Sequence, residues 1–186
     1  MKLTKKLLYY LAIGSVLGAV GYSAYYYITQ DKVVIYDYNY HNDAAAIKNI
    51  FMEDRDLLLA PGAVNPEQYI DFLLEHQAAI FEPNIHETIK VLHEGKKVAG
   101  FITYSRKNFY RGKIRLLGIG RAYRGKGYGT RLLEYAKKDL INQGCTVVYL
   151  TTRKDNYPAQ SIYKKAGLKQ TKVLDDDFVR FEYQVD

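Results

Sequence analysis

The sequence has few of the residues from which disulfides and metal sites are built. Cys145 is the only cysteine, so no intrachain disulfide can form and nothing indicates an oxidising compartment. Because the apolar residues Val147, Val148 and Leu150 follow it, we expect Cys145 to be packed in the core and not to act as a nucleophile. The histidines are scattered without the spacing of zinc ligands, at His41, His76, His86 and His93. We therefore predict no metal.

The amino terminus lacks charge over a long stretch. Residues 7–30 contain no charged side chain, and a helix of these 24 residues, at about 1.5 Å per residue, could cross a hydrocarbon layer of roughly 30 Å. Tyrosines flank the apolar middle of the stretch, where aromatic rings settle at membrane interfaces. We therefore predict a membrane anchor over residues 1–31, a single-pass membrane location, and a separate domain over residues 32–186.

Two questions about this segment stay open at the level of sequence. The basic leader MKLTKK and the small residues in AVG and YSA are also compatible with a cleaved signal peptide. If the segment is retained, Lys2, Lys5 and Lys6 precede it and Lys32 alone follows directly, a bias that places the amino terminus in the cytoplasm and the domain outside.

The remaining composition is that of one folded domain. Charged residues make up 25% and hydrophobic residues 48%, which is typical of a globular chain. The net charge is +7, to which the three lysines of the leader contribute much. The excess is compatible with ligands that carry phosphate, but no other feature indicates nucleic acid, and we expect no nucleic-acid partner.

Hydrophobic periodicity and turn signals indicate a mixed α/β domain. We expect a mostly antiparallel central sheet flanked by helices, in the order β-α-α-β-β-β-α-β-α-β-β. A turn at Glu94–Lys96 joins two β-rich runs, Pro158 lies in the first turn of a helix, and Gly167 ends that helix. The strands and helices are expected near residues 32–40, 42–59, 66–80, 87–94, 97–108, 113–120, 130–143, 145–152, 158–167, 168–174 and 178–185.

The stretch RAYRGKGYGTRLL, residues 121–133, joins a strand to a helix through several glycines. Such a turn brings free N–H groups and the positive end of the helix dipole close to an anion. A nucleotide-binding P-loop requires Ser or Thr where Gly127 stands, and a dinucleotide fingerprint requires glycine where Tyr123 stands. A glycine-rich turn without a ligand is the remaining structural alternative.

Two motifs identify a family resemblance. RGKGYG, residues 124–129, matches the pattern [RQ]-x-x-G-x-[GA] of the GNAT superfamily of N-acetyltransferases. NYPAQSIYKKAGL, residues 156–168, is similar to a second segment of that family, in the expected order and on the expected element. The resemblance covers about residues 33–185 and is strong over residues 116–168.

The resemblance implies an acetyl-CoA site. The main chain of Leu117 and Ile119 is expected to pair with pantetheine, Asn156 and Tyr163 to lie near the reactive end, and Lys165 to meet an adenosine phosphate. The loop expected to hold the pyrophosphate consists of Arg124, Gly125, Lys126, Gly127, Tyr128, Gly129 and Thr130.

The reaction implied is direct attack of a primary amine, on a small molecule, peptide or protein, on the thioester of acetyl-CoA. Tyr163 is the candidate general acid, since a phenol with a pKa of about 10 is protonated at neutral pH. Residues 113–120 offer no carboxylate, so Glu87, His86 or water is the candidate base. The alternative is a non-catalytic module that binds CoA at a membrane. Acetyl-CoA supply favours a cytoplasmic domain and opposes the lysine bias, so the side of the membrane is undecided.

Overall fold

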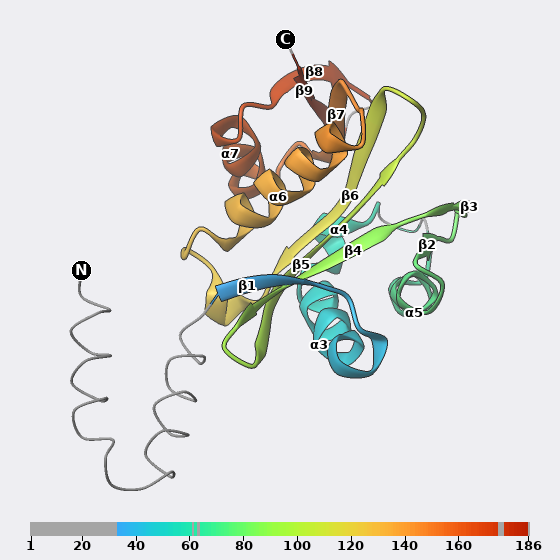
Figure 1. Ribbon diagram of the computed structural model, residues 1–186, viewed down its shortest axis with the longest axis vertical. Helices are drawn as coiled ribbons and strands as arrows, with labels where there is room; N and C mark the ends of the chain where they lie inside the picture. Colours follow the sequence, from blue (N-terminus) through green and yellow to red (C-terminus); the bar gives the residue numbers. More distant parts are fainter. Residues whose placement is uncertain (1–32, 61, 63, 175–176, 186) are drawn as a thin grey trace, which may run out of the picture.

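The computed structural model describes residues 33–60, 62, 64–174 and 177–185 (Figure 1). Its main sheet has seven strands, which lie side by side in the order β1-β4-β5-β6-β7-β9-β8. Neighbouring strands are antiparallel except for β6 and β7, which are parallel. The strands are β1 (Val33–Asp37), β4 (Thr88–Glu94), β5 (Lys97–Arg106), β6 (Arg111–Ile119), β7 (Val147–Arg153), β8 (Lys169–Val173) and β9 (Phe178–Gln184).

Helices cover both faces of this sheet (Figure 1). The helices are α3 (Tyr40–Glu53), α4 (Arg55–Leu58), α5 (Pro66–His76), α6 (Tyr128–Asn142) and α7 (Tyr157–Lys165), with a 3-10 turn, η1 (Arg121–Tyr123), before α6. The predicted fold class and the order of the long elements are confirmed. The predicted helix over residues 42–59 covers both α3 and α4, but the break between them at Asp54 was not predicted. A small hairpin of β2 (Ala78–Ala79) and β3 (Glu82–His86) was not predicted either, because β2 is too short to show a periodic pattern and β3 contains proline and asparagine, which are rare in strands.

The hydrophobic core consists of two clusters, one on each face of the sheet. On one face, α6 and α7 pack on the sheet, with Leu132, Leu133 and Phe181 fully buried. On the other face, α3 and α5 pack on Phe101 and Leu116 of the sheet. Cys145 is buried in the first cluster, as predicted.

Local signals fix the ends of the elements. Asn39 caps α3 by accepting a hydrogen bond from the Asn42 N–H, so the helix begins at Tyr40, two residues earlier than predicted. The turn between β4 and β5 lies where it was predicted, and Gly95 has a φ of 63° there.

A bulge in β6 changes which face its side chains reach. Thr103 pairs with Leu116 and Tyr104 pairs with Ile114, so Arg115 is an extra residue in β6. Ile114 therefore lies in the cluster beneath α6, while Leu116 lies in the cluster beneath α3. This switch brings Leu117 to the same face as α6.

The predicted single-pass membrane location is corrected. Within the described part of the chain, no helix is long and apolar enough to cross a membrane. The longest described helix, α6, has 15 residues and therefore spans about 22 Å, and one of its faces is polar. The predicted anchor at residues 1–31 lies outside the described residues.

Candidate active site

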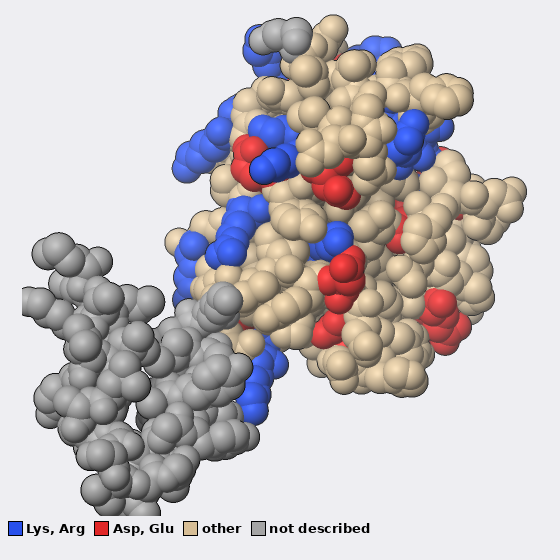
Figure 2. All heavy atoms as spheres, in the orientation of Figure 1, with Lys and Arg blue, Asp and Glu red and all other residues tan. Residues whose placement is uncertain are grey.

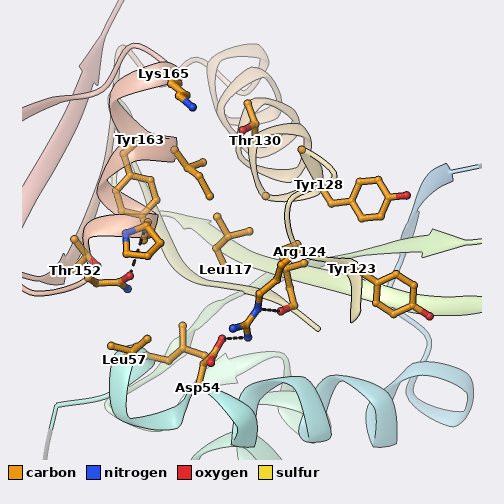
Figure 3. A pocket seen from close by; sticks show the side chains of 18 of the residues that line it. Asp54, Leu57, Leu117, Tyr123, Arg124, Tyr128, Thr130, Thr152, Tyr163 and Lys165 are labelled. Carbon is orange, nitrogen blue, oxygen red and sulfur yellow. Dashed lines mark hydrogen bonds and ion pairs between the residues drawn. The ribbon is translucent and has the colours of Figure 1, made fainter. Parts of the chain in front are cut away.

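The parallel strands β6 and β7 separate along their length and leave a gap. They pair only from Arg111 with Val147 to Lys113 with Tyr149. Beyond this point a cavity of about 450 Å³ opens between Leu117 and Ile119 of β6 and Thr152 of β7. Figure 3 shows Leu117 on one side of this cavity and Thr152 and Tyr163 on the other.

The end of the cavity is formed by the turn between β6 and α6. Gly125 and Gly127 have φ values of 76° and 80°, a conformation that side chains disfavour, and a Cβ at either position would meet open space. Gly127 is the N-cap of α6 and provides no side-chain hydrogen bond, and the first turn of α6 contains no acidic residue. The asparagines that precede α3, α5 and α7, by contrast, each accept a backbone N–H.

The N-terminus of α6 is therefore suited to hold an external anion, since its first N–H groups have no partner within the helix. Figure 2 shows Lys and Arg side chains gathered on the side of the molecule that carries α6 and α7, while Asp and Glu lie mostly toward α3 and α5. The field near the turn thus favours a negatively charged ligand.

The cationic side chains of the turn are paired with acids of the protein itself. The Arg124 guanidinium donates to the Ile119 carbonyl oxygen at 3.0 Å and to Asp54 Oδ2 at 2.5 Å, across the mouth of the cavity (Figure 3). Lys126 Nζ lies 2.8 Å from a carboxylate oxygen of Glu94. The Ile119 carbonyl, which was expected to pair with pantetheine, thus has an internal partner in this state.

Most of the predicted cofactor residues come together around the cavity. The lining includes Leu117, Ile119, Arg124, Gly125, Gly127, Tyr128, Gly129, Thr130, Asn156, Tyr163 and Lys165. Lys126 instead points to Glu94. Asn156 also caps α7, because its side chain accepts from the Ala159 N–H at 3.3 Å.

Tyr163 is buried in the wall of the cavity. Its side chain is 7% exposed, and its ring packs on Phe181 with 5.6 Å between the ring centroids. Burial raises the pKa of Tyr163 to about 12, and a hydrogen bond with the Thr152 side chain lowers it in part. The phenol is therefore protonated at neutral pH and can donate a proton into the cavity.

Glu87 lies behind the cavity wall and not at its surface. It is fully buried, and its Oε1 accepts hydrogen bonds from Ser105 Oγ at 3.0 Å and Arg115 Nε at 2.8 Å. Within the described residues its Oε2 has no hydrogen-bond partner. Arg115 itself lines the cavity, so Glu87 reaches the site through Arg115. His86 ends β3 and is exposed.

Several lining residues were missed in the sequence. Asp54 and Leu57 come from the α3–α4 junction, and Thr151 and Thr152 come from β7. No motif marks Asp54 or Leu57, because their place depends on how α3 packs against β6. The two threonines follow directly after the predicted strand core, and their polar character at a strand end was an available signal.

Comparison with known proteins assigns the family. The model of the Acetyltransferase (GNAT) family matches residues 44–168. The chain belongs to this family. An N-alpha-acetyltransferase of Saccharolobus solfataricus is 27% identical over 137 residues, which cover 69% of this chain and 82% of that protein.

Two solved structures share the fold of this GNAT chain. The structure of yncA from Salmonella typhimurium with its cofactor acetyl-CoA has a TM-score of 0.65 and 17% identity, covering 83% of this chain and 95% of that one. The paia N-acetyltransferase from Thermoplasma acidophilum, in complex with coenzyme A, has a TM-score of 0.62 and 19% identity, covering 82% and 99%. The predicted acetyl-CoA dependent N-acetyltransferase is confirmed. Within the described part of the chain, no cluster of His, Cys, Asp or Glu could hold a metal.

Proposed function

We propose that this enzyme transfers the acetyl group of acetyl-CoA, bound between β6 and β7, to the α-amine of a peptide or protein. One observation carries the proposal: the gap between the strands leads from Tyr163 to the uncapped N-terminus of α6. A ligand with an anionic diphosphate and a long neutral arm suits this combination of charge and shape. The likeness to an N-alpha-acetyltransferase supports the choice of an α-amine as acceptor.

The residues of the turn would bind the diphosphate of the donor. Backbone N–H groups of residues 124–130 and the helix dipole of α6 favour the negative charge. Arg124 would leave Asp54 and the Ile119 carbonyl, which frees that carbonyl for an amide of the donor. Lys165, which lines the cavity from α7 (Figure 3), would meet a further phosphate.

The chemistry proposed is direct transfer. The neutral amine attacks the thioester carbonyl carbon, a C–N bond forms, and the C–S bond breaks as the tetrahedral oxyanion collapses. Tyr163 donates its proton to the departing thiolate and is reprotonated from solvent. Glu87 stays our predicted base for the proton that the amine loses; its Oε2 has no hydrogen-bond partner among the described residues, and it contacts Arg115, which lines the cavity.

The test is acetyl transfer to peptides that differ only at the amino terminus. A peptide with a free α-amine and one internal lysine should be acetylated, with release of one free thiol per acetyl group. The same peptide with a blocked α-amine should remain unmodified, which separates an α-amine from a lysine ε-amine as acceptor. Binding of acetyl-CoA without thiol release with any amine would favour a non-catalytic module.

A further inference from the structure

A cluster of cations lies beside the proposed acetyl-transfer site, on the face of β7 and β9 opposite to α6 and α7. Side chains of a strand point alternately to the two faces of the sheet. The side chains that face α6 and α7 are those of Val148, Leu150, Val179 and Phe181, so the residues between them lie on the other face. We call these cations, together with the tyrosine and the glutamate beside them, the cationic platform. It consists of Arg111, Lys113, Tyr149, Arg180 and Glu182.

Strand register places the cationic platform next to the cavity. Arg180 is directly opposite Thr151, which lines the cavity, and directly opposite residues share a face of the sheet. Lys113 pairs with Tyr149, which pairs in turn with Glu182. Tyr149 lies two residues before Thr151 and therefore about 7 Å along the strand from the cavity wall.

The two arginines enclose the tyrosine ring. The guanidinium carbon of Arg111 lies 4.8 Å from the centroid of Tyr149, and that of Arg180 lies 5.0 Å from it. These cation–π contacts hold both guanidinium groups in fixed positions. An anion that arrives here meets preordered donors, so little side-chain entropy is lost on binding.

The acids of the protein satisfy only part of this charge. Glu182 bonds Arg111 at 2.7 Å and lies 4.0 Å from Arg180, while Lys113 lies 3.9 Å from Glu82. Glu82 is also bonded by Lys107 and Arg115. Glu82 thus lies nearer to other cations than to Lys113, and Glu182 lies nearer to Arg111 than to Arg180.

Two further observations indicate an unmet need for negative charge. Arg180 Nε is buried and has no hydrogen-bond partner in the described part of the chain. Burial, together with the nearby charge of Arg115, lowers the pKa of Lys113. Both side chains remain about a quarter exposed, so a ligand can reach them.

We infer that the cationic platform binds a carboxylate of the acceptor, so that the enzyme prefers amino termini with an acidic side chain at the second or third residue. The inference rests on the proposed function, because it places the acceptor α-amine beside Tyr163. An extended peptide rises about 3.4 Å per residue, and Tyr149 lies about 7 Å along β7 from Thr151 of the cavity wall, so a residue two positions beyond that wall falls over Tyr149. A carboxylate there would accept charge-assisted hydrogen bonds from Arg180 and Lys113.

The experiment compares two peptides that differ only in charge, one with Glu and one with Gln at the second and third positions. We expect kcat/KM to be about tenfold higher for the Glu peptide, the value of one charge-assisted hydrogen bond. Arg180→Met and Lys113→Met should each reduce this ratio toward one. Lys138→Met, which removes an exposed charge of α6 away from the cationic platform, should leave the ratio unchanged.

A charge reversal and a binding measurement complete the test. Arg180→Glu should favour a peptide with Lys at the same positions, provided that its thermal unfolding midpoint stays close to that of the wild type. Calorimetric binding of both peptides to the protein loaded with CoA measures the preference without turnover. Acetylation or binding with no preference for Glu would overturn the inference and leave the proposed function intact, whereas preferential binding without acetylation would overturn the function alone.

Discussion

Replacement of Tyr163 by phenylalanine isolates the role of one hydroxyl group. The ring is 7% exposed and packs on Phe181, and phenylalanine keeps that packing while it removes only the oxygen. Loss of the hydrogen bond with Thr152 should change the free energy of unfolding by about 1 kcal/mol. The fold should therefore persist, and any large change in rate should come from the missing proton donor.

The expected effect of Tyr163→Phe is a fall in kcat of about 100-fold, at the low end of what a general acid contributes. This corresponds to about 2.7 kcal/mol in the activation free energy. The KM for acetyl-CoA should change little, because the substitution removes no group from the turn that binds the donor.

The assay is continuous thiol release with a free peptide amine as acceptor, and the matched control is Tyr157→Phe. Tyr157 lies on the same helix but is 73% exposed, so its hydroxyl should not matter. A kcat for Tyr163→Phe within twofold of the wild type would refute the assignment of Tyr163 as the acid. An equal loss in both variants would indicate a general effect on α7.

Three further predictions follow from the site and its surroundings. Gly127→Val forces a β-branched residue into a φ of 80°. The variant should bind acetyl-CoA about tenfold or more weakly when binding is measured by calorimetry. An unchanged affinity would show that the turn does not hold the donor. Asp54→Asn should release Arg124 and tighten acetyl-CoA binding by a few-fold at low salt, with the gain lost at high salt, so weaker binding would contradict the described pairing of Arg124. Burial raises the pKa of Glu82, but hydrogen bonds from Lys107 and Arg115 and the charges of Arg115 and Lys113 outweigh it and lower the pKa from 4.5 to about 2. The stability that Glu82 contributes is therefore present above the unfolded pKa and is lost as the pH falls toward 2. Denaturant unfolding from about pH 6 to about pH 3 should show the advantage of the wild type over Glu82→Gln shrinking with acid, and a constant difference would contradict it.

The sequence predicted those parts of the site that are local along the chain. The turn at residues 121–133 could be identified because its glycines must adopt positive φ, as Gly125 and Gly127 do. Asn156, the N-cap of α7, and Tyr163, within α7, were identified because both belong to a second motif of the same family, residues 156–168.

The parts that depend on long-range packing were not predictable in this way. Asp54 faces Arg124 from 70 residues away, and this contact depends on how α3 sits on the sheet. The burial of Glu87 behind Arg115 depends on the bulge in β6, which no local pattern reveals. The same applies to Arg180, which approaches Thr151 only through the pairing of β7 with β9.

The corrected membrane location has a related cause. The prediction used only the length and apolarity of residues 7–30, and these residues lie outside the part of the chain that the structure describes. The helices α3, α5, α6 and α7 each bury one face, and in α6 this face carries Leu132 and Leu140 toward the core. Hydrophobicity in the described chain is thus used for packing on the sheet.

The most direct test of the central claim is simultaneous measurement of thiol release and peptide mass with acetyl-CoA and a peptide bearing a free α-amine. We expect the peptide to gain the mass of one acetyl group at its amino terminus at the rate at which free thiol appears. We also expect Tyr163→Phe to slow both signals equally. Thiol release without an acetylated amino terminus, or tight acetyl-CoA binding with neither signal, would contradict acetyl transfer to an α-amine.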